Sequence, residues 1–142
     1  MPVVGARIDV RNIHGSATTV RWSRAGRVPA PSTYTESGVP AVALRGEVGL
    51  DGFLSCRDAL TSALNTGART VVLDLRWARV HDGSIPMLSL VRRWCRRRGA
   101  ALVLLVAGTE TEAVLRRARV LPLYRIVSGW QEAIAIEAAP SS

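Results

Sequence analysis

The stretch TVVLDLRWARVHDGSIPMLSLVRRWCRRRGAALVLLV, residues 70–106, decides the fold. TVVLDL (70–75) is β-branched and almost wholly apolar, as a strand buried on both faces of a sheet would be, and ALVLLV (101–106) repeats that signal. The segment between them, about 84–98, has helical character and ends before Gly99, a natural left-handed residue after a helix. The stretch therefore predicts a parallel strand–helix–strand unit with a right-handed crossover.

The flanking sequence continues this alternation of strands and helices, which defines the α/β class. We predict a single domain with an open, mixed or parallel central sheet of four to five strands and about four helices. Further strands are predicted at 41–48 and 124–127, and further helices at 52–64, from Thr109 or Thr111 to Arg119, and at 129–137. The domain is expected to span residues 40–138, followed by a disordered tail at 139–142.

Residues 1–39 are expected to precede this domain as a separate extension. ARIDVRN (6–12) and ATTVRWSR (17–24) alternate enough to be strands. The stretch 25–38 contains two prolines, two glycines and many hydroxyl groups, and it reads as a loop or flexible insertion. The ordered chain is therefore expected to resume at Val39.

The helix predicted at 84–98 has two unlike faces when it is drawn on a wheel at about 100° per residue. One arc is apolar, and it contains Met87, Leu88, Leu90, Val91, Trp94 and Cys95. The opposite arc contains Ser89 and the arginines Arg92, Arg93, Arg96 and Arg97. The apolar arc is expected to pack on the sheet. The arginines form either a solvated face or a contact with an acidic partner or a phosphate backbone.

Length and composition suit one globular domain. The chain has 142 residues, of which 48% are hydrophobic and 21% charged, enough for one core and too few for two ordinary domains. All nineteen basic residues are arginine, and the net charge is +8. Such a charge indicates a solvated basic surface or, alternatively, a nucleic-acid or acidic-protein partner.

Cys56 and Cys95 fall on the apolar sides of two predicted helices and lack the spacing of metal ligands. Two isolated cysteines of this kind suit core positions in a reducing compartment. Neither a signal peptide nor an apolar run long enough to span a membrane is evident. The expectation is a soluble cytoplasmic protein without a metal or cofactor.

The turn Asp82-Gly83-Ser84 follows a buried strand and opens a helix, the place where open α/β sheets usually carry their chemistry. Ser84 would suit phosphorylation, because a helix N-terminus offers free N–H donors and a positive dipole end. It would equally suit a plain helix cap. Asp82 could orient Ser84 or contact a partner, or it could simply hold the loop as an Asx-turn residue.

Two other polar residues have structural interpretations. Asp74 lies in a buried strand and is expected to be a hydrogen-bonded structural carboxylate. His81 adjoins Asp82, but neither a nucleophile nor a third orienting group accompanies them in the sequence. We therefore expect no enzymatic activity.

Five motifs, in order and at matching spacing, resemble those of the STAS domain family, the anti-sigma factor antagonists. The resemblance covers residues 41–137 and implies a STAS-like (SpoIIAA-like) fold. The motifs are a strand ending in Gly46-Glu47, VVLDL at 71–75, the turn Asp82-Gly83-Ser84-Ile85 in place of Asp-Ser-Ser-Gly, Arg98-Gly99 before LVLLV, and LYRIV at 123–127 before SGWQEAIA.

The resemblance implies a switch in protein interactions. A histidine-kinase-like anti-sigma factor would bind the unmodified chain, release its sigma factor, and let go once it had phosphorylated Ser84. For this role the Ser84 hydroxyl should be accessible to solvent. The partner-facing residues implied are Glu47, Asp51, His81, Asp82, Gly83, Ser84 and Ile85.

The chain departs from the family pattern at this same end: Gly83 replaces the first serine of the turn, Ile85 replaces the glycine after the second, and Gly49 replaces an acidic residue. The alternatives are a diverged STAS module that scaffolds a complex without phosphorylation, and a basic nucleic-acid-binding domain that uses the arginine helix.

Overall fold

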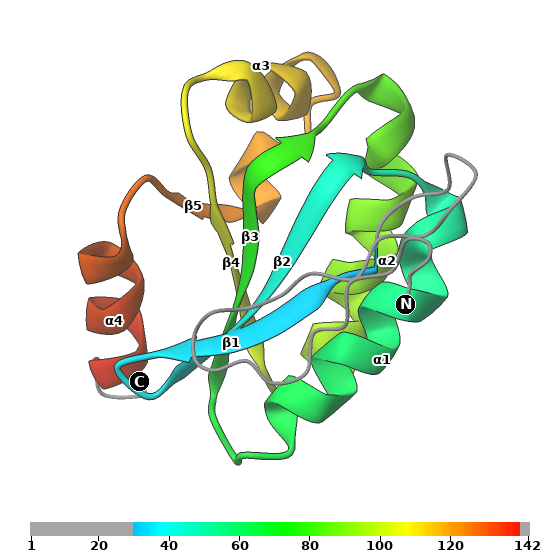
Figure 1. Cartoon of the computed structure of the whole chain (residues 1–142). Coiled ribbons are helices and arrows are strands. Elements are labelled where there is room, and N and C mark those ends of the chain that lie inside the picture. The colour runs from blue at the N-terminus through cyan, green and yellow to red at the C-terminus, as the bar shows by residue number, and fades with distance from the viewer. Residues whose placement is uncertain (1–29, 140–142) are drawn as a thin grey trace, which may run out of the picture.

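The computed structural model describes residues 30–139, which form a five-stranded sheet with helices on both faces (Figure 1). The elements are β1 (Ser32–Glu36), β2 (Val39–Glu47), α1 (Phe53–Leu64), β3 (Thr70–Arg79), α2 (Ile85–Arg97), β4 (Ala101–Leu105), α3 (Glu110–Arg117), β5 (Arg125–Val127) and α4 (Trp130–Ala138). Three 3-10 turns join them: η1 (Leu50–Gly52), η2 (Asp82–Ser84) and η3 (Leu121–Leu123). The predicted α/β class and open mixed sheet are confirmed. The strands predicted at 6–12 and 17–24, and all but the first residue of the predicted tail, lie outside the described residues.

The strands follow one another across the sheet in chain order, from β1 to β5. β1 is antiparallel to β2, and every other pair is parallel. β3 is therefore the central strand. Its carboxyl end and that of β2 meet at the same edge as the N-terminus of α2, as the sequence predicted for the turn at 82–84.

The prediction of a loop at 25–38 is wrong for its last part. Ser32–Glu36 forms β1 and pairs with Val39–Ala43 of β2. The two residues between the strands, Ser37 and Gly38, have φ values of 51° and 82°, which suit the tight turn of a two-residue hairpin. The β-branched and aromatic composition of STYTE, followed by a glycine turn, outweighs the nearby prolines.

β3 is longer than predicted: the strand was expected to end at Leu75, but it continues through residues 76–79. Its pairing with β2 contains a bulge: Ala43 lies opposite Asp74, whereas Arg45 lies opposite Trp77, so β3 has one additional residue in this interval. An extra residue reverses the alternation of side chains beyond it. Trp77 consequently points away from the face on which Leu75 and Ala78 pack.

Two hydrophobic cores fill the space on either side of the sheet. The larger lies beneath α1 and α2 and contains Leu73, Leu104 and the apolar arc of α2. The smaller lies beneath α4 and contains Val72, Val103 and Ala133. Leu73 and Leu104 are fully buried, as expected of strands covered on both faces.

The two faces of α2 are arranged as predicted. Its buried residues are Met87, Leu88, Val91 and Cys95. Arg93, Arg96 and Arg97 are exposed, while Arg92 is half-buried and its Nε donates to the Leu123 carbonyl at 3.0 Å. Cys56 and Cys95 are both buried free thiols, as predicted for small core residues.

Candidate functional site

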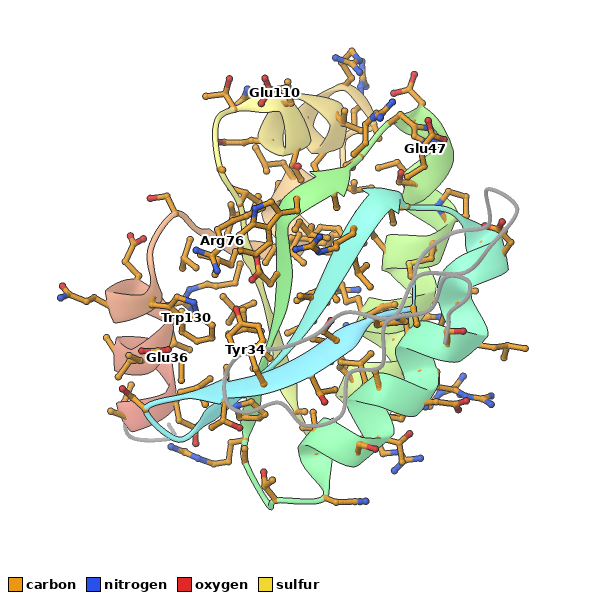
Figure 2. The ribbon with its side chains drawn as sticks, in the orientation of Figure 1. Tyr34, Glu36, Glu47, Arg76, Glu110 and Trp130 are labelled. Carbon is orange, nitrogen blue, oxygen red and sulfur yellow. The ribbon has the colours of Figure 1, made fainter. Side chains whose placement is uncertain are left out.

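The predicted partner-facing residues gather where β2 and β3 end, around the turns η1 and η2. We call this edge the rim and define it as Glu47, Asp51 and residues 81–85. Glu47 ends β2 and lies at this end of the molecule (Figure 2), while Asp51 lies in η1. Within the rim, Glu47, Asp51, His81, Asp82 and Gly83 are exposed, Ile85 is half-buried, and Ser84 is buried.

The expectation of an accessible Ser84 hydroxyl is wrong, because Ser84 is 0% exposed. Its Oγ donates to the Val48 carbonyl oxygen at 2.5 Å and accepts from the His81 backbone N–H at 3.0 Å. The serine ends the 3-10 turn and occupies the N-cap position of α2, but its side chain makes no capping hydrogen bond to that helix. Ile85 after it packs against the larger core. The hydroxyl therefore satisfies two backbone groups that would otherwise lack partners in the interior.

His81, rather than Asp82, holds the turn. Its Nδ1 accepts the Gly83 backbone N–H at 3.0 Å, and its own N–H is the one bonded to Ser84 Oγ. These bonds form a reciprocal capping box at the start of η2. Because Nδ1 is an acceptor, the hydrogen-bond pattern assigns the ring proton to Nε2, which lies 3.6 Å from Glu47 Oε1.

The glycine at position 83 is explained by this histidine. A Cβ at Gly83 would lie 2.8 Å from His81 Cε1 and 3.1 Å from its Nδ1. A side chain there would displace the ring and break the bond that closes the turn. The absence of a side chain at position 83 and the capping role of His81 are thus linked.

The charged groups of the rim are paired on the surface. Glu47 lies 3.6 Å from Arg79 as well as from His81, and Asp82 lies 3.3 Å from Arg117 of α3. Exposed pairs of this kind contribute only about 0–1 kcal/mol each, so a partner can exchange them at little cost. Asp82 does not orient Ser84: its carboxylate points to α3 and is 80% exposed.

Four residues near the rim were not predicted from the sequence. Arg79 and Arg117 were not predicted because their partners are set by the tertiary fold. Leu50 and Leu54 are 51% and 60% exposed and lie on either side of Asp51 and Gly52. Leu54 was detectable, since it shares the outward face of α1 with Arg57 and Asp58 at helical spacing.

The rim has the character of a recognition surface. It contains exposed ion pairs and lies beside the exposed Leu50 and Leu54, while the hydroxyl of its buried Ser84 is already hydrogen-bonded to two backbone groups. Over residues 30–139, no group of three or more His, Cys, Asp or Glu side chains is placed to hold a metal ion. The same residues contain no helix that is long and apolar enough to cross a membrane.

Comparisons with known proteins give matches in structure but not in sequence. The sequence matches no protein-family model, and no curated protein matches it. An anti-sigma factor antagonist from Mycobacterium paratuberculosis superposes with a TM-score of 0.62 at 12% identity, covering 78% of this chain and 94% of the other. A Thermotoga maritima protein with a proposed role as anti-sigma factor antagonist gives 0.63 at 14%, covering 77% and 95%.

The unphosphorylated form of the anti-sigma factor antagonist SpoIIAA gives a TM-score of 0.57 at 10% identity, covering 79% of this chain and all of its own. At such low sequence identities, the structural similarity establishes the fold alone. The chain has the SpoIIAA-like fold of the anti-sigma factor antagonists, as the resemblance in its motifs predicted.

Proposed function

We propose that this chain is an anti-sigma factor antagonist that binds a histidine-kinase-like anti-sigma factor through the rim. Three observations support the proposal: the SpoIIAA-like fold, the five family motifs in order, and the exposed charges and leucines at the edge where the motifs converge. Binding would occupy the anti-sigma factor and free its sigma factor for transcription.

We further propose that this binding is not switched by phosphorylation of Ser84. The observation that carries this step is the burial of its hydroxyl between the Val48 carbonyl and the His81 N–H. A phosphate there would place roughly two negative charges in a buried position next to a carbonyl oxygen. Desolvating that charge without a partner is costly, so η2 would have to open before a kinase could act.

The test uses purified chain and each histidine-kinase-like anti-sigma factor encoded in the same genome. Binding is measured by calorimetry with and without ATP, and the chain is then weighed by intact mass spectrometry. We expect one tight complex that persists with ATP and no added phosphoryl group. A phosphoryl group on Ser84 that dissociates the complex would establish the switch instead, and no complex with any candidate would refute the anti-sigma assignment.

A charge reversal locates the interface. Glu47→Lys should weaken the complex at least tenfold, because Glu47 is central to the charge pairs of the rim. Asp58→Lys is the matched control, since Asp58 is also an exposed carboxylate but lies in α1, where its ion pair is with Arg57. Equal weakening by both variants would show a general effect of charge and not a contact at the rim.

A further inference from the structure

α2 presents a row of unpaired arginines to solvent. The helix lies with α1 on one side of the sheet, whereas α4 lies on the other (Figure 1). Its outward side chains include Arg93, Arg96 and Arg97, and all three are exposed. Within the part of the chain that the structure describes, none of these three side chains has an ion pair or a hydrogen bond. The sequence supplies no carboxylate nearby, because residues 83–109 contain no aspartate or glutamate.

Six arginines outside α2, by contrast, are neutralised by carboxylates. Asp74 is fully buried, as expected of a structural carboxylate, and accepts from Arg76 Nη2 at 2.9 Å. On α3, Arg116 pairs with Glu112 of the same helix at 3.2 Å. Unpaired guanidiniums in a row are therefore a particular feature of α2. The six arginines with a carboxylate within 3.9 Å are Arg57, Arg69, Arg76, Arg79, Arg116 and Arg117.

The helix dipole accounts for part of this arrangement. Cations in the last turn of a helix are stabilised by its free carbonyl groups, and Arg96 and Arg97 occupy that turn of α2. Arg93 lies one turn earlier, where the effect has faded. Like charges three and four residues apart on a helix repel one another. An anionic group lying against this row would relieve that repulsion.

An exposed leucine borders the arginines. Leu123 of η3 is 51% exposed, and its carbonyl oxygen accepts from Arg92 Nε at 3.0 Å. Arg92 directly precedes Arg93 and lies one turn before Arg96, so Leu123 is alongside the row. We call Arg93, Arg96, Arg97 and Leu123 the α2 surface. An apolar group next to charged ones is the composition of a protein-binding surface.

Charge complementarity selects an acidic protein segment as the occupant. Residues 1–29 contain five arginines and one aspartate, so they have the wrong sign. A second copy of the chain has the same net charge of +8, and its exposed Glu47 and Asp82 already have arginine partners. A nucleic-acid backbone offers no apolar group to Leu123. Moreover, the row would neutralise only about three phosphates, too few to hold a nucleic acid at physiological salt.

We propose that the α2 surface docks an acidic, amphipathic helix of a partner protein. Residues four apart are about 6 Å apart along a helix axis, so carboxylates at that spacing on a facing helix match the interval between Arg93 and Arg97. These carboxylates form charge-assisted hydrogen bonds with the row, and an apolar side chain on the same face packs on Leu123. This docking goes beyond the proposed function of the rim and does not require the rim.

The test uses the full chain, labelled with 15N, and two helical peptides of identical composition at physiological salt. In the one-face peptide, glutamates three and four residues apart share a face with a leucine. In the scattered peptide, the same residues are distributed around the helix. The one-face peptide should shift the backbone amide signals of residues 92–97 and 121–123 saturably. The scattered peptide should bind about tenfold more weakly, the loss expected when one charge-assisted hydrogen bond is not made. No saturable shift with the one-face peptide would overturn the proposal.

Three variants separate the α2 surface from general electrostatic attraction. Arg93→Gln should weaken binding of the one-face peptide about tenfold, by loss of one charge-assisted contact. Arg125→Gln is the matched control. Arg125 is also exposed and has no ion pair among the described residues, but its register with Val103 places it on the α4 face of the sheet. Leu123→Ser should weaken binding too, although it changes no charge. Equal weakening by the two arginine variants, or none by Leu123→Ser, would overturn the proposal.

The other occupants would give different results. A single-stranded DNA oligonucleotide of equal charge should shift the same signals only at low salt. If it binds more tightly than the one-face peptide at physiological salt, the surface is a nucleic-acid site and the proposal is overturned. Sedimentation of the chain alone should give the same particle size for the wild type and for the Arg93→Gln/Arg97→Gln variant. Self-association that the variant abolishes would identify a second copy as the occupant, which would also overturn the proposal.

Discussion

At the scale of one residue, Ser84 matters because its buried hydroxyl is hydrogen-bonded to two backbone groups. Ser84→Ala would leave the Val48 carbonyl and the His81 N–H unpaired in the interior. We expect a loss of about 1–3 kcal/mol in the free energy of unfolding, measured with urea. Ser84→Asp should lose more, because it also buries a charge.

Ser89→Ala supplies the control for this prediction. Ser89 lies on the exposed side of α2, and its replacement should change stability by no more than about 0.5 kcal/mol. If Ser84→Ala is as stable as the wild type, the two hydrogen bonds are unimportant and the hydroxyl is freer than the structure indicates.

The two core thiols make a residue-scale prediction about pH. Burial raises the pKa of both Cys56 and Cys95 from 9.0 to about 12, with Cys95 adding to the shift at Cys56. The folded pKa lies above the unfolded one, so the unfolded chain ionises first as pH rises. The stabilisation is complete below pH 9.0 and is lost progressively toward about pH 12.

By pH 10 each thiol should account for a loss of about 1 kcal/mol relative to pH 8. The measurement is urea unfolding at both pH values with a reductant present. The Cys56→Ala/Cys95→Ala double variant will be less stable at both, because it leaves cavities, but the difference between the two pH values should shrink. An unchanged difference would mean that other groups, such as tyrosines, govern the alkaline limit.

At the scale of the element, the β1–β2 hairpin depends on the conformation of Gly38. Its φ of 82° is unfavourable for residues with a Cβ, so Gly38→Ala should cost about 1–2 kcal/mol even though no atom lies within 4 Å of the new carbon. Gly52→Ala is the matched control, because Gly52 is equally uncrowded and has a φ of −94°. Thermal unfolding of both variants measures the difference, and equal midpoints would contradict the assigned turn.

The elements that the sequence predicted well are those in which local pattern and burial agree. The strands at 70–75 and 101–106 and the helix between them are apolar where the sheet is covered. The two continuous apolar runs, the helical spacing between them and Gly99 were enough to locate them. β1 was missed because two prolines nearby suggested a loop. The β3 bulge has no pattern of its own, so the outward position of Trp77 could not be read from the sequence.

The site was harder to predict than the fold for a related reason. The motifs placed the rim correctly at the ends of β2 and β3. The burial of Ser84, however, depends on the Val48 carbonyl, 36 residues away in the chain. The capping by His81 depends on a 3-10 turn whose φ and ψ angles only the folded chain fixes. Contacts of this kind cannot be predicted from the spacing of residues in the sequence.

At the scale of the whole molecule, a net charge of +8 raises the question of nucleic-acid binding. We expect weak, non-specific binding at low salt that disappears at physiological salt, because each neutralised phosphate adds about 0.9 to the slope of log K against log salt. Arg93→Ala, Arg96→Ala and Arg97→Ala together should reduce the low-salt binding without changing the free energy of unfolding. Arg92 is kept, since its side chain secures the Leu123 carbonyl.

Fluorescence anisotropy with labelled duplex DNA, read over a series of salt concentrations, makes this measurement. A complex that survives physiological salt and is abolished by the triple variant would establish the arginine face of α2 as a nucleic-acid site. That outcome would leave the proposal for the rim unchanged, because Arg93, Arg96 and Arg97 lie further along α2, whereas the rim includes only the first residue of that helix.

The additional residue in β3 has a consequence for how this protein can evolve. Removing one residue between Asp74 and Trp77 would restore regular pairing with β2, and every side chain from Trp77 to Val80 would then exchange sides. An indole and an arginine would enter the larger core, while Ala78 and Val80 would leave it. Substitutions on this strand can accumulate one at a time, but a single-codon deletion there would change several environments at once. We therefore expect this fold to tolerate substitutions across the short interval better than a change in its length.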